Sequence, residues 1–108
     1  MLDGIYYNGV KFFRFYKDGT LLDCLIKGEG DRKQVAGWLK KENVISGVIK
    51  GRYTSRNGII SFSTPDRFGD GRMINYTGKA NGGKEILLTS LNHNTGRKIV
   101  NERFVRLL

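Results

Sequence analysis

Glycine-containing turn signals divide this chain into short segments. Asn-Gly and Asp-Gly pairs favour the two-residue turn of a β-hairpin, because both central residues of that turn need positive φ angles. Such pairs or close variants stand at Asn8-Gly9, Asp18-Gly19, Asn57-Gly58, Asp70-Gly71, Asn81-Gly82-Gly83 and Asn94-Thr95-Gly96. Glycine supplies 15 of the 108 residues and proline only 1, so tight turns are frequent and rigid breaks are rare. The sequence therefore predicts strands joined mostly by hairpins.

The segments between the turns are rich in Ile, Val, Tyr, Phe and Thr. They cover about 4–8, 10–17, 20–27, 45–55, 59–64, 72–79, 84–91 and 97–107. Eight such strands are typical of an antiparallel meander that closes as a barrel or folds as a sandwich. Alternation places Phe13 and Phe15 on one face and Arg14 on the other. One apolar face and one amphiphilic face suit a small barrel with room for side chains or one small ligand, so we expect a mainly β fold and a single domain over 1–108.

Residues 31–42 break the strand pattern. Val35, Trp38 and Leu39 fall at i, i+3 and i+4, which forms one apolar stripe on a helix. Asp31 and Gln34 resemble a capping box at its start. The sequence predicts one short α-helix between the third and fourth strands.

The rarity of reactive side chains excludes several classes of protein. A single cysteine, Cys24, excludes an internal disulfide and multi-thiolate metal sites, and we expect it to be a buried thiol. The only histidine, His93, lies in a turn without companions for metal binding or general-base catalysis. We therefore expect no enzyme, no catalytic residue, no metal and no cofactor. No apolar run is long enough to span a bilayer and no secretory signal opens the chain, so we expect a cytoplasmic protein.

Several short motifs are similar to those of small bacterial proteins that have a lipocalin-like (calycin-type) barrel and no assigned activity. The motifs are Gly4-Ile5-Tyr6-Tyr7, Phe13-Arg14-Phe15-Tyr16-Lys17-Asp18-Gly19-Thr20, Trp38-Leu39 and Ile60-Ser61-Phe62-Ser63. In lipocalins, a Gly-x-Trp on the first strand is covered by an arginine near the last strand. The resemblance implies that Gly4-x-Tyr6 takes the first role and that Arg103 or Arg106 takes the second. It implies a fold and a cavity without naming a ligand.

The first functional hypothesis is a non-enzymatic module that binds a small molecule in a modest, partly apolar barrel cavity. The helix around Trp38 would cap the cavity as a lid, although the same helix would also serve as a plug that completes the core. The predicted wall consists of Tyr6, Phe13, Phe15, Trp38, Tyr53, Tyr76 and Phe104. Arg14 or Arg103 would meet any anionic group of an amphiphilic or anionic ligand.

Two alternative hypotheses do not require a ligand cavity. The chain carries 19 Lys and Arg against 10 Asp and Glu, a net charge of +9, which favours weak binding of nucleic acid or another polyanion. Its basic residues alternate with aromatic ones, the pattern of a stacking platform for single strands. The basic residues are Arg14, Lys50, Arg52, Arg56, Arg67, Arg72, Arg97, Arg103 and Arg106, and the aromatic ones are Phe12, Tyr53, Phe68, Tyr76 and Phe104. The third hypothesis is a structural or partner-binding domain with a filled core, for which a homodimer is one arrangement.

Overall fold

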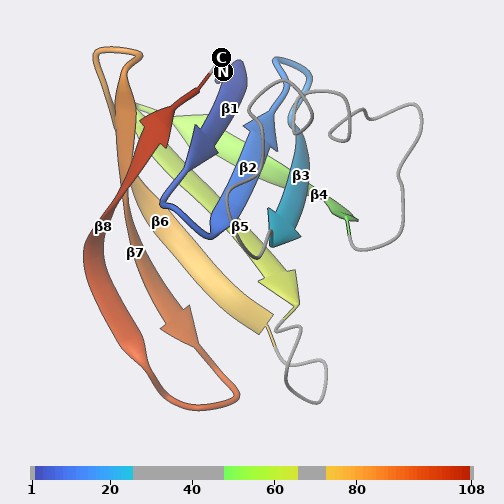
Figure 1. Cartoon of the computed structure of the whole chain (residues 1–108), viewed down its shortest axis with the longest axis vertical. Coiled ribbons are helices and arrows are strands. Elements are labelled where there is room, and N and C mark those ends of the chain that lie inside the picture. The colour runs from blue at the N-terminus through green and yellow to red at the C-terminus, as the bar shows by residue number, and fades with distance from the viewer. Residues whose placement is uncertain (1, 26–47, 66–72, 108) are drawn as a thin grey trace.

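The computed structural model describes residues 2–25, 48–65 and 73–107. These residues form a closed β-barrel. Its strands are β1 (Gly4–Tyr7), β2 (Lys11–Phe15), β3 (Thr20–Leu25), β4 (Val48–Arg56), β5 (Ile59–Pro65), β6 (Met73–Asn81), β7 (Glu85–Asn92) and β8 (Lys98–Arg106). Each strand pairs antiparallel with the next one in the chain (Figure 1). The predicted eight-stranded antiparallel barrel is confirmed. The helix predicted over residues 31–42, which includes Trp38, lies outside the described residues.

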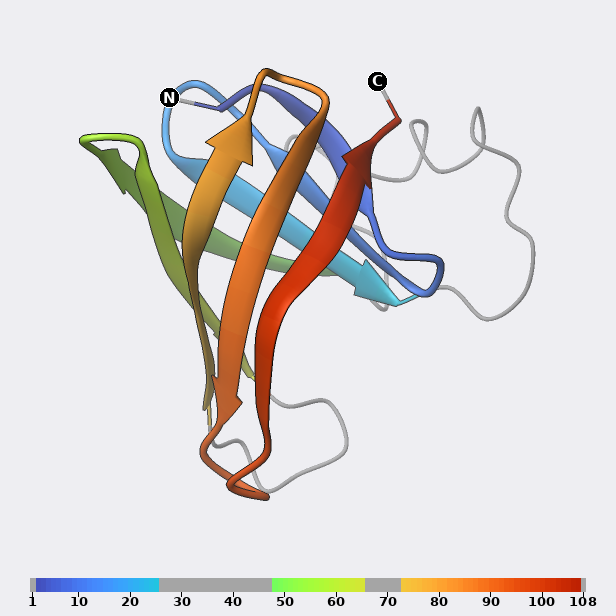
Figure 2. The same ribbon diagram turned by 90° about the vertical axis from the view of Figure 1, so that its left-hand side faces the viewer.

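The barrel closes where the first strand meets the last one. Tyr6 lies opposite Arg106 and Tyr7 opposite Val105 in an antiparallel pairing. This seam is short because β1 has only 4 residues, whereas β8 has 9. Figure 2 shows β7 and β8 continuing well past the lower ends of β1 and β2, so the barrel is much longer on one side than on the other. None of the described residues forms a helix that is long and apolar enough to cross a membrane.

The turn chemistry acts as the sequence predicts at the hairpin between β4 and β5. Asn57 has φ 53° and Gly58 has φ 77°, so both central residues are in the left-handed region that a type I′ turn requires. The turn before β3 uses a side chain instead, because Asp18 Oδ1 accepts a hydrogen bond from the Thr20 amide at 2.9 Å. These local interactions set the register of the strands that carry the core.

The interior of the barrel is a cluster of apolar and aromatic side chains. Its buried members are Tyr6, Phe13, Phe15, Leu21, Tyr53, Ile60, Phe62, Tyr76, Ile86, Leu88 and Phe104. Phe13 is central, with its ring centroid 5.1–5.3 Å from those of Phe62, Tyr76 and Phe104. Such contacts between rings stabilise the core beyond the area they bury. Phe13 and Phe15 of β2 share the inward face, as the sequence predicts.

A second apolar cluster lies on the outer face of β1–β4. Ile5, Phe12, Leu22, Cys24 and Val48 alternate with the inward residues of their strands and are nonetheless buried. Apolar side chains therefore cover much of the outer side of β1–β3, and Val48 at the start of β4 joins them. By contrast, the outward positions of β5 and β6 are exposed, so the barrel has two chemically different sides.

Candidate ligand site inside the barrel

The aromatic side chains of the predicted wall come together inside the barrel. Tyr6, Phe13, Phe15, Tyr53, Tyr76 and Phe104 belong to one cluster, and none is more than 6% exposed. They are inward because they occupy alternate positions of their strands, and successive side chains of a strand point to opposite faces. Aromatic pairs in this cluster have centroid distances of 4.8–6.1 Å, so much of the wall contacts itself. Trp38, the remaining predicted wall residue, lies outside the described residues.

The two predicted arginines do not join this wall. Arg14 stands between Phe13 and Phe15 in β2, so its side chain is on the outer face, where its guanidinium carbon lies 5.0 Å from the Tyr16 ring centroid. Arg103 is on the outer face of β8, with its side chain 67% exposed and ion-paired with Glu85. The hydrogen bond from Arg103 is the main cause of a lowered Glu85 pKa. Neither guanidinium is placed to meet a ligand inside the barrel.

Arg106, rather than Arg103, is the arginine beside Tyr6. Burial raises the pKa of the Tyr6 hydroxyl, and the charge of Arg106 and a hydrogen bond from it oppose that rise. The Tyr53 hydroxyl lies 2.8 Å from the Leu2 carbonyl and 2.5 Å from the Tyr16 carbonyl. Burial is also the main reason why the pKa of Tyr53 rises to about 12. Tyr53 therefore links β4 to the residues that precede β1 and follow β2.

An ion pair that was not predicted from the sequence lies in the interior. The Lys11 ammonium is 3.5 Å from Asp23 Oδ2, with the side chains 13% and 0% exposed. Lys11 also donates a hydrogen bond to the Tyr76 hydroxyl at 3.2 Å. Its Nζ lies 5.5 Å from the Phe13 ring centroid and 5.6 Å from that of Tyr76, so two aromatic faces contact the cation. Burial raises the pKa of Tyr76, and Lys11 partly offsets this rise.

The sequence contained a signal for this pair. Lys11 occupies the same alternating row as Phe13 and Phe15, and Asp23 stands between Leu21 and Leu25. A charged residue in an otherwise apolar inward row must lose its hydration. This desolvation costs several kcal/mol per ion, and the attraction between the two charges offsets only part of that cost. The pair therefore contributes little to the stability of the fold and is a better candidate for recognising a ligand.

Within the described part of the chain, open space adjoins the inward row of β4. Gly51 lies two residues before the inward Tyr53, and no described atom lies within 4 Å of a Cβ built on Gly51. The register that sets Tyr53 opposite Phe62 places Thr64 of β5 on the same side, two residues further along. Thr64 is 2% exposed, and its hydroxyl has no hydrogen-bond partner in the described structure. An unused buried hydroxyl is costly unless something binds it.

Neither metal chemistry nor similarity to other proteins assigns a role to this site. Within residues 2–25, 48–65 and 73–107, no group of three or more His, Cys, Asp and Glu side chains is arranged to hold a metal ion. Comparisons of the chain with protein-family models, with curated proteins and with solved structures find no match.

Proposed function

We propose that this protein is a non-enzymatic module that binds a small molecule inside its barrel. The observation that carries the proposal is the Lys11–Asp23 pair, which is held in the interior beside the aromatic cluster. Ligand sites are usually apolar cavities in which a few placed polar groups orient the ligand. Among the described residues, the open space at Gly51 supplies room, and the Thr64 hydroxyl, which has no hydrogen-bond partner there, supplies a further polar contact.

The chemistry of the pair favours a ligand with a neutral polar group. Lys11 is a donor and Asp23 is an acceptor, and together they carry no net charge. A hydroxyl or amide group can accept from the first and donate to the second, whereas an anion would be repelled by the carboxylate. The outward positions of Arg14 and Arg103 also argue against an anionic group in the interior. We therefore infer a compact apolar body with one hydroxyl or amide head group.

We also propose that the barrel is lipocalin-like. Eight antiparallel strands in chain order support this assignment, as does the closure of β1 on β8. The position of Arg106 beside Tyr6 supports it further, because it corresponds to the arginine and aromatic residue that meet at the closed end of a lipocalin. This assignment concerns the fold and leaves the ligand to be found by experiment.

Phenol and benzene are suitable first probes, because they differ only in the hydroxyl group. Binding is measured by the NMR shifts of methyl groups. We expect phenol to perturb the inward methyls of Leu21, Ile60 and Leu88 and to leave the outward methyls of Val100 unchanged. We expect benzene to bind about tenfold more weakly, because it makes no hydrogen bond to Lys11, Asp23 or Thr64.

Two variants test the site itself. Lys11→Met/Asp23→Leu removes both charges together, a change that buried ion pairs often tolerate, and should abolish the preference for phenol. Gly51→Val should fill the open space and weaken both probes. Inward methyls that respond to neither probe would show a filled core and overturn the proposal. A preference for phenol that survives in the double variant would also overturn it.

A further inference from the structure

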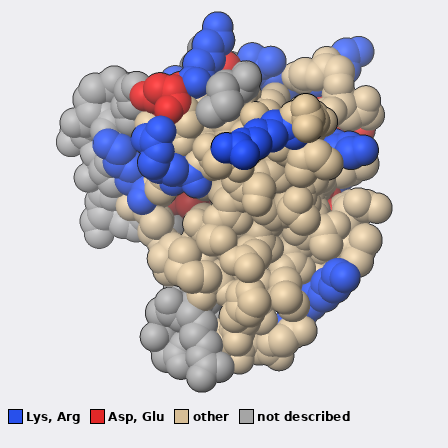
Figure 3. Space-filling model, turned by 180° about the vertical axis from the view of Figure 1, so that it is seen from behind, with Lys and Arg blue, Asp and Glu red and all other residues tan. Residues whose placement is uncertain are grey.

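Three neighbouring strands carry only positive charge. Strands β4, β5 and β6 contain four basic residues and no Asp or Glu. The basic residues Lys50, Arg52, Arg56 and Lys79 are all exposed. Figure 3 views the barrel from behind and shows basic side chains in a band across the upper part of this side, above a largely uncharged lower part. We call the outward surface of β4, β5 and β6 the β4–β6 face.

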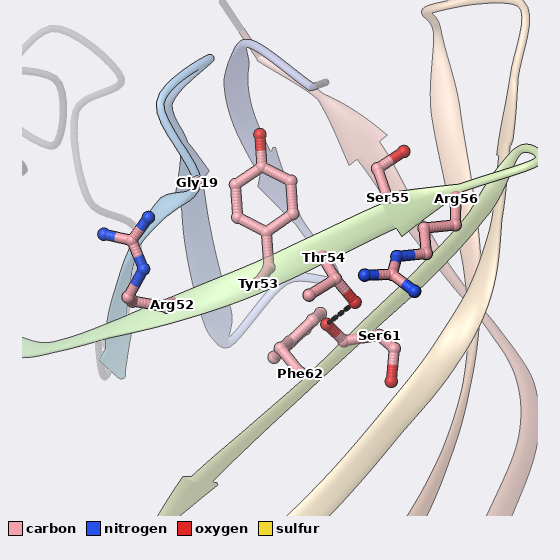
Figure 4. Close-up of a pocket in the computed structure, with 8 residues that line it drawn as sticks. All are labelled: Gly19, Arg52, Tyr53, Thr54, Ser55, Arg56, Ser61 and Phe62. Atoms are coloured by element: carbon pink, nitrogen blue, oxygen red, sulfur yellow. Dashed lines mark hydrogen bonds between the residues drawn. The ribbon is translucent and has the colours of Figure 1, made fainter.

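Arg52 and Arg56 stand on either side of a groove. The groove has a volume of about 560 Å³ and lies along β4 and β5, with Thr54 and Ser61 between the two arginines (Figure 4). Arg52 is oriented by a hydrogen bond to the Asp18 carbonyl at 2.9 Å. The Thr54 hydroxyl donates to the Ser61 carbonyl at 3.4 Å. Two guanidinium groups and two hydroxyl groups therefore face one concavity.

The strand register extends the hydroxyl groups into a row. Thr54 lies opposite Ser61, Ser61 opposite Thr77, and Thr77 opposite Thr89. These residues cross four strands, which are spaced by roughly 4.8 Å. Beside this row, the Ser63 hydroxyl of β5 is 2.6 Å from Oδ1 of Asn75, the residue opposite it in β6. The uncharged part of the face thus presents many hydrogen-bonding groups on a continuous sheet.

Aromatic residues are missing from the exposed part of this face, as far as the described structure shows. Tyr53, Phe62 and Tyr76 point inward and are 3%, 5% and 6% exposed. Stacking on aromatic side chains is a principal source of affinity for single-stranded nucleic acids. Without it, the face lacks a principal source of affinity for such a strand. Hydroxyl and amide groups are better matched to the hydroxyl groups of sugars.

We propose that the β4–β6 face binds an acidic polysaccharide. Arginine recognises planar anions through paired hydrogen bonds, so Arg52 and Arg56 would bind carboxylate or sulfate groups, with Lys79 adding a point charge. The row of Thr and Ser side chains would bind the sugar hydroxyls. This surface lies outside the barrel and does not depend on the interior site.

The test measures binding to heparin and to polygalacturonate, with neutral dextran and an oligothymidylate for comparison. The variant Arg56→Gln/Lys79→Gln removes two positive charges from the face. The control Lys84→Gln/Arg97→Gln removes two from exposed positions outside these strands. We expect the first variant to bind the acidic polysaccharides about a hundredfold more weakly at low salt, at about tenfold for each charge-assisted contact. The control should change the affinity by less than about threefold.

A third variant separates sugar recognition from charge. Thr77→Val keeps every charge and should weaken polysaccharide binding about fivefold while leaving oligothymidylate binding unchanged. Thermal unfolding of each variant confirms that the barrel is intact. Equal losses in the two double variants would show nonspecific attraction and overturn the proposal. Binding of oligothymidylate that is tighter than that of either polysaccharide would assign the face to nucleic acid instead, and failure to bind heparin or polygalacturonate would also refute it.

Discussion

Gly78 of β6 is a position where the barrel should tolerate a side chain poorly. It lies opposite Leu88 in the β6–β7 pairing. A Cβ built there would be 1.8 Å from the Leu87 carbonyl oxygen and 2.8 Å from its carbonyl carbon, both of which are backbone atoms. Gly51 provides a matched control on an inward row, because a Cβ there would meet no described atom within 4 Å.

The expected cost of Gly78→Ala comes from the displacement of β7. Real Cβ atoms do not approach other atoms within 3.0 Å, so the two strands must separate locally by more than roughly 1 Å. That displacement weakens nearby ladder hydrogen bonds, at about 1 kcal/mol each, and disturbs core packing at about 1–3 kcal/mol. We expect Gly78→Ala to lower the free energy of unfolding by about 3 kcal/mol. Gly51→Ala should change it by less than about 1 kcal/mol, with a gain expected from the lower entropy of the unfolded chain.

Urea denaturation of both variants, followed by far-ultraviolet circular dichroism, provides the measurement. For a domain of this size, each kcal/mol corresponds to about 4–8 °C in Tm, so Gly78→Ala should also lower the Tm by more than about 10 °C. Wild-type stability in Gly78→Ala would refute the argument from backbone contact. Equal destabilisation of both variants would refute it as well. That result would show that the lost stability comes from replacing any glycine in a strand, and not from the contact with the Leu87 backbone.

Three other predictions concern buried polar groups. Tyr53→Phe removes the hydroxyl that bridges to two backbone carbonyls and should cost about 1–2 kcal/mol, measured by urea denaturation. Since the folded barrel raises the pKa of Tyr53 to about 12 and also raises that of Tyr76, wild-type stability should be complete below pH 10 and fall as the pH rises from 10 towards 12. A weaker dependence on alkaline pH in Tyr53→Phe is expected, and an identical one would contradict this assignment. Lys11→Met alone should destabilise the barrel by about 3 kcal/mol, because it leaves the Asp23 charge in the interior without Lys11. The double variant Lys11→Met/Asp23→Leu should recover most of that loss. A double variant that is less stable than the single one would contradict this expectation, because it would show that the pair itself stabilises the fold.

Much of the barrel follows from short-range patterns in the chain. Asn57-Gly58 predicts its own turn because few other residue pairs accept two successive positive φ angles. Alternation predicts that Phe13 and Phe15 share the inward face and that Arg14 is on the outer face. The inward aromatic residues of the predicted wall could be selected for the same reason. The sequence hypothesis nevertheless used Arg14 as an inward residue, against the alternation that it had itself identified.

Lys11 and Asp23 could have been noticed as charges in inward rows, although their partners could not. Lys11 meets Tyr76, which is 65 residues away along the chain. Alternation predicts which face of its strand a residue occupies. It does not predict which other strand supplies the contacting side chain, or at which position along the barrel axis the two side chains meet. The open space beside Gly51 likewise depends on how the surrounding strands curve.

The amino-acid sequence by itself determined the turns, the number of strands and the two faces of each strand, because these depend on neighbours a few residues apart. Only the tertiary structure decided that β1 closes on β8, that Arg106 rather than Arg103 reaches Tyr6, and that a lysine and an aspartate meet in the interior. Those outcomes depend on the stagger and curvature of the whole sheet, which bring together residues from distant parts of the chain.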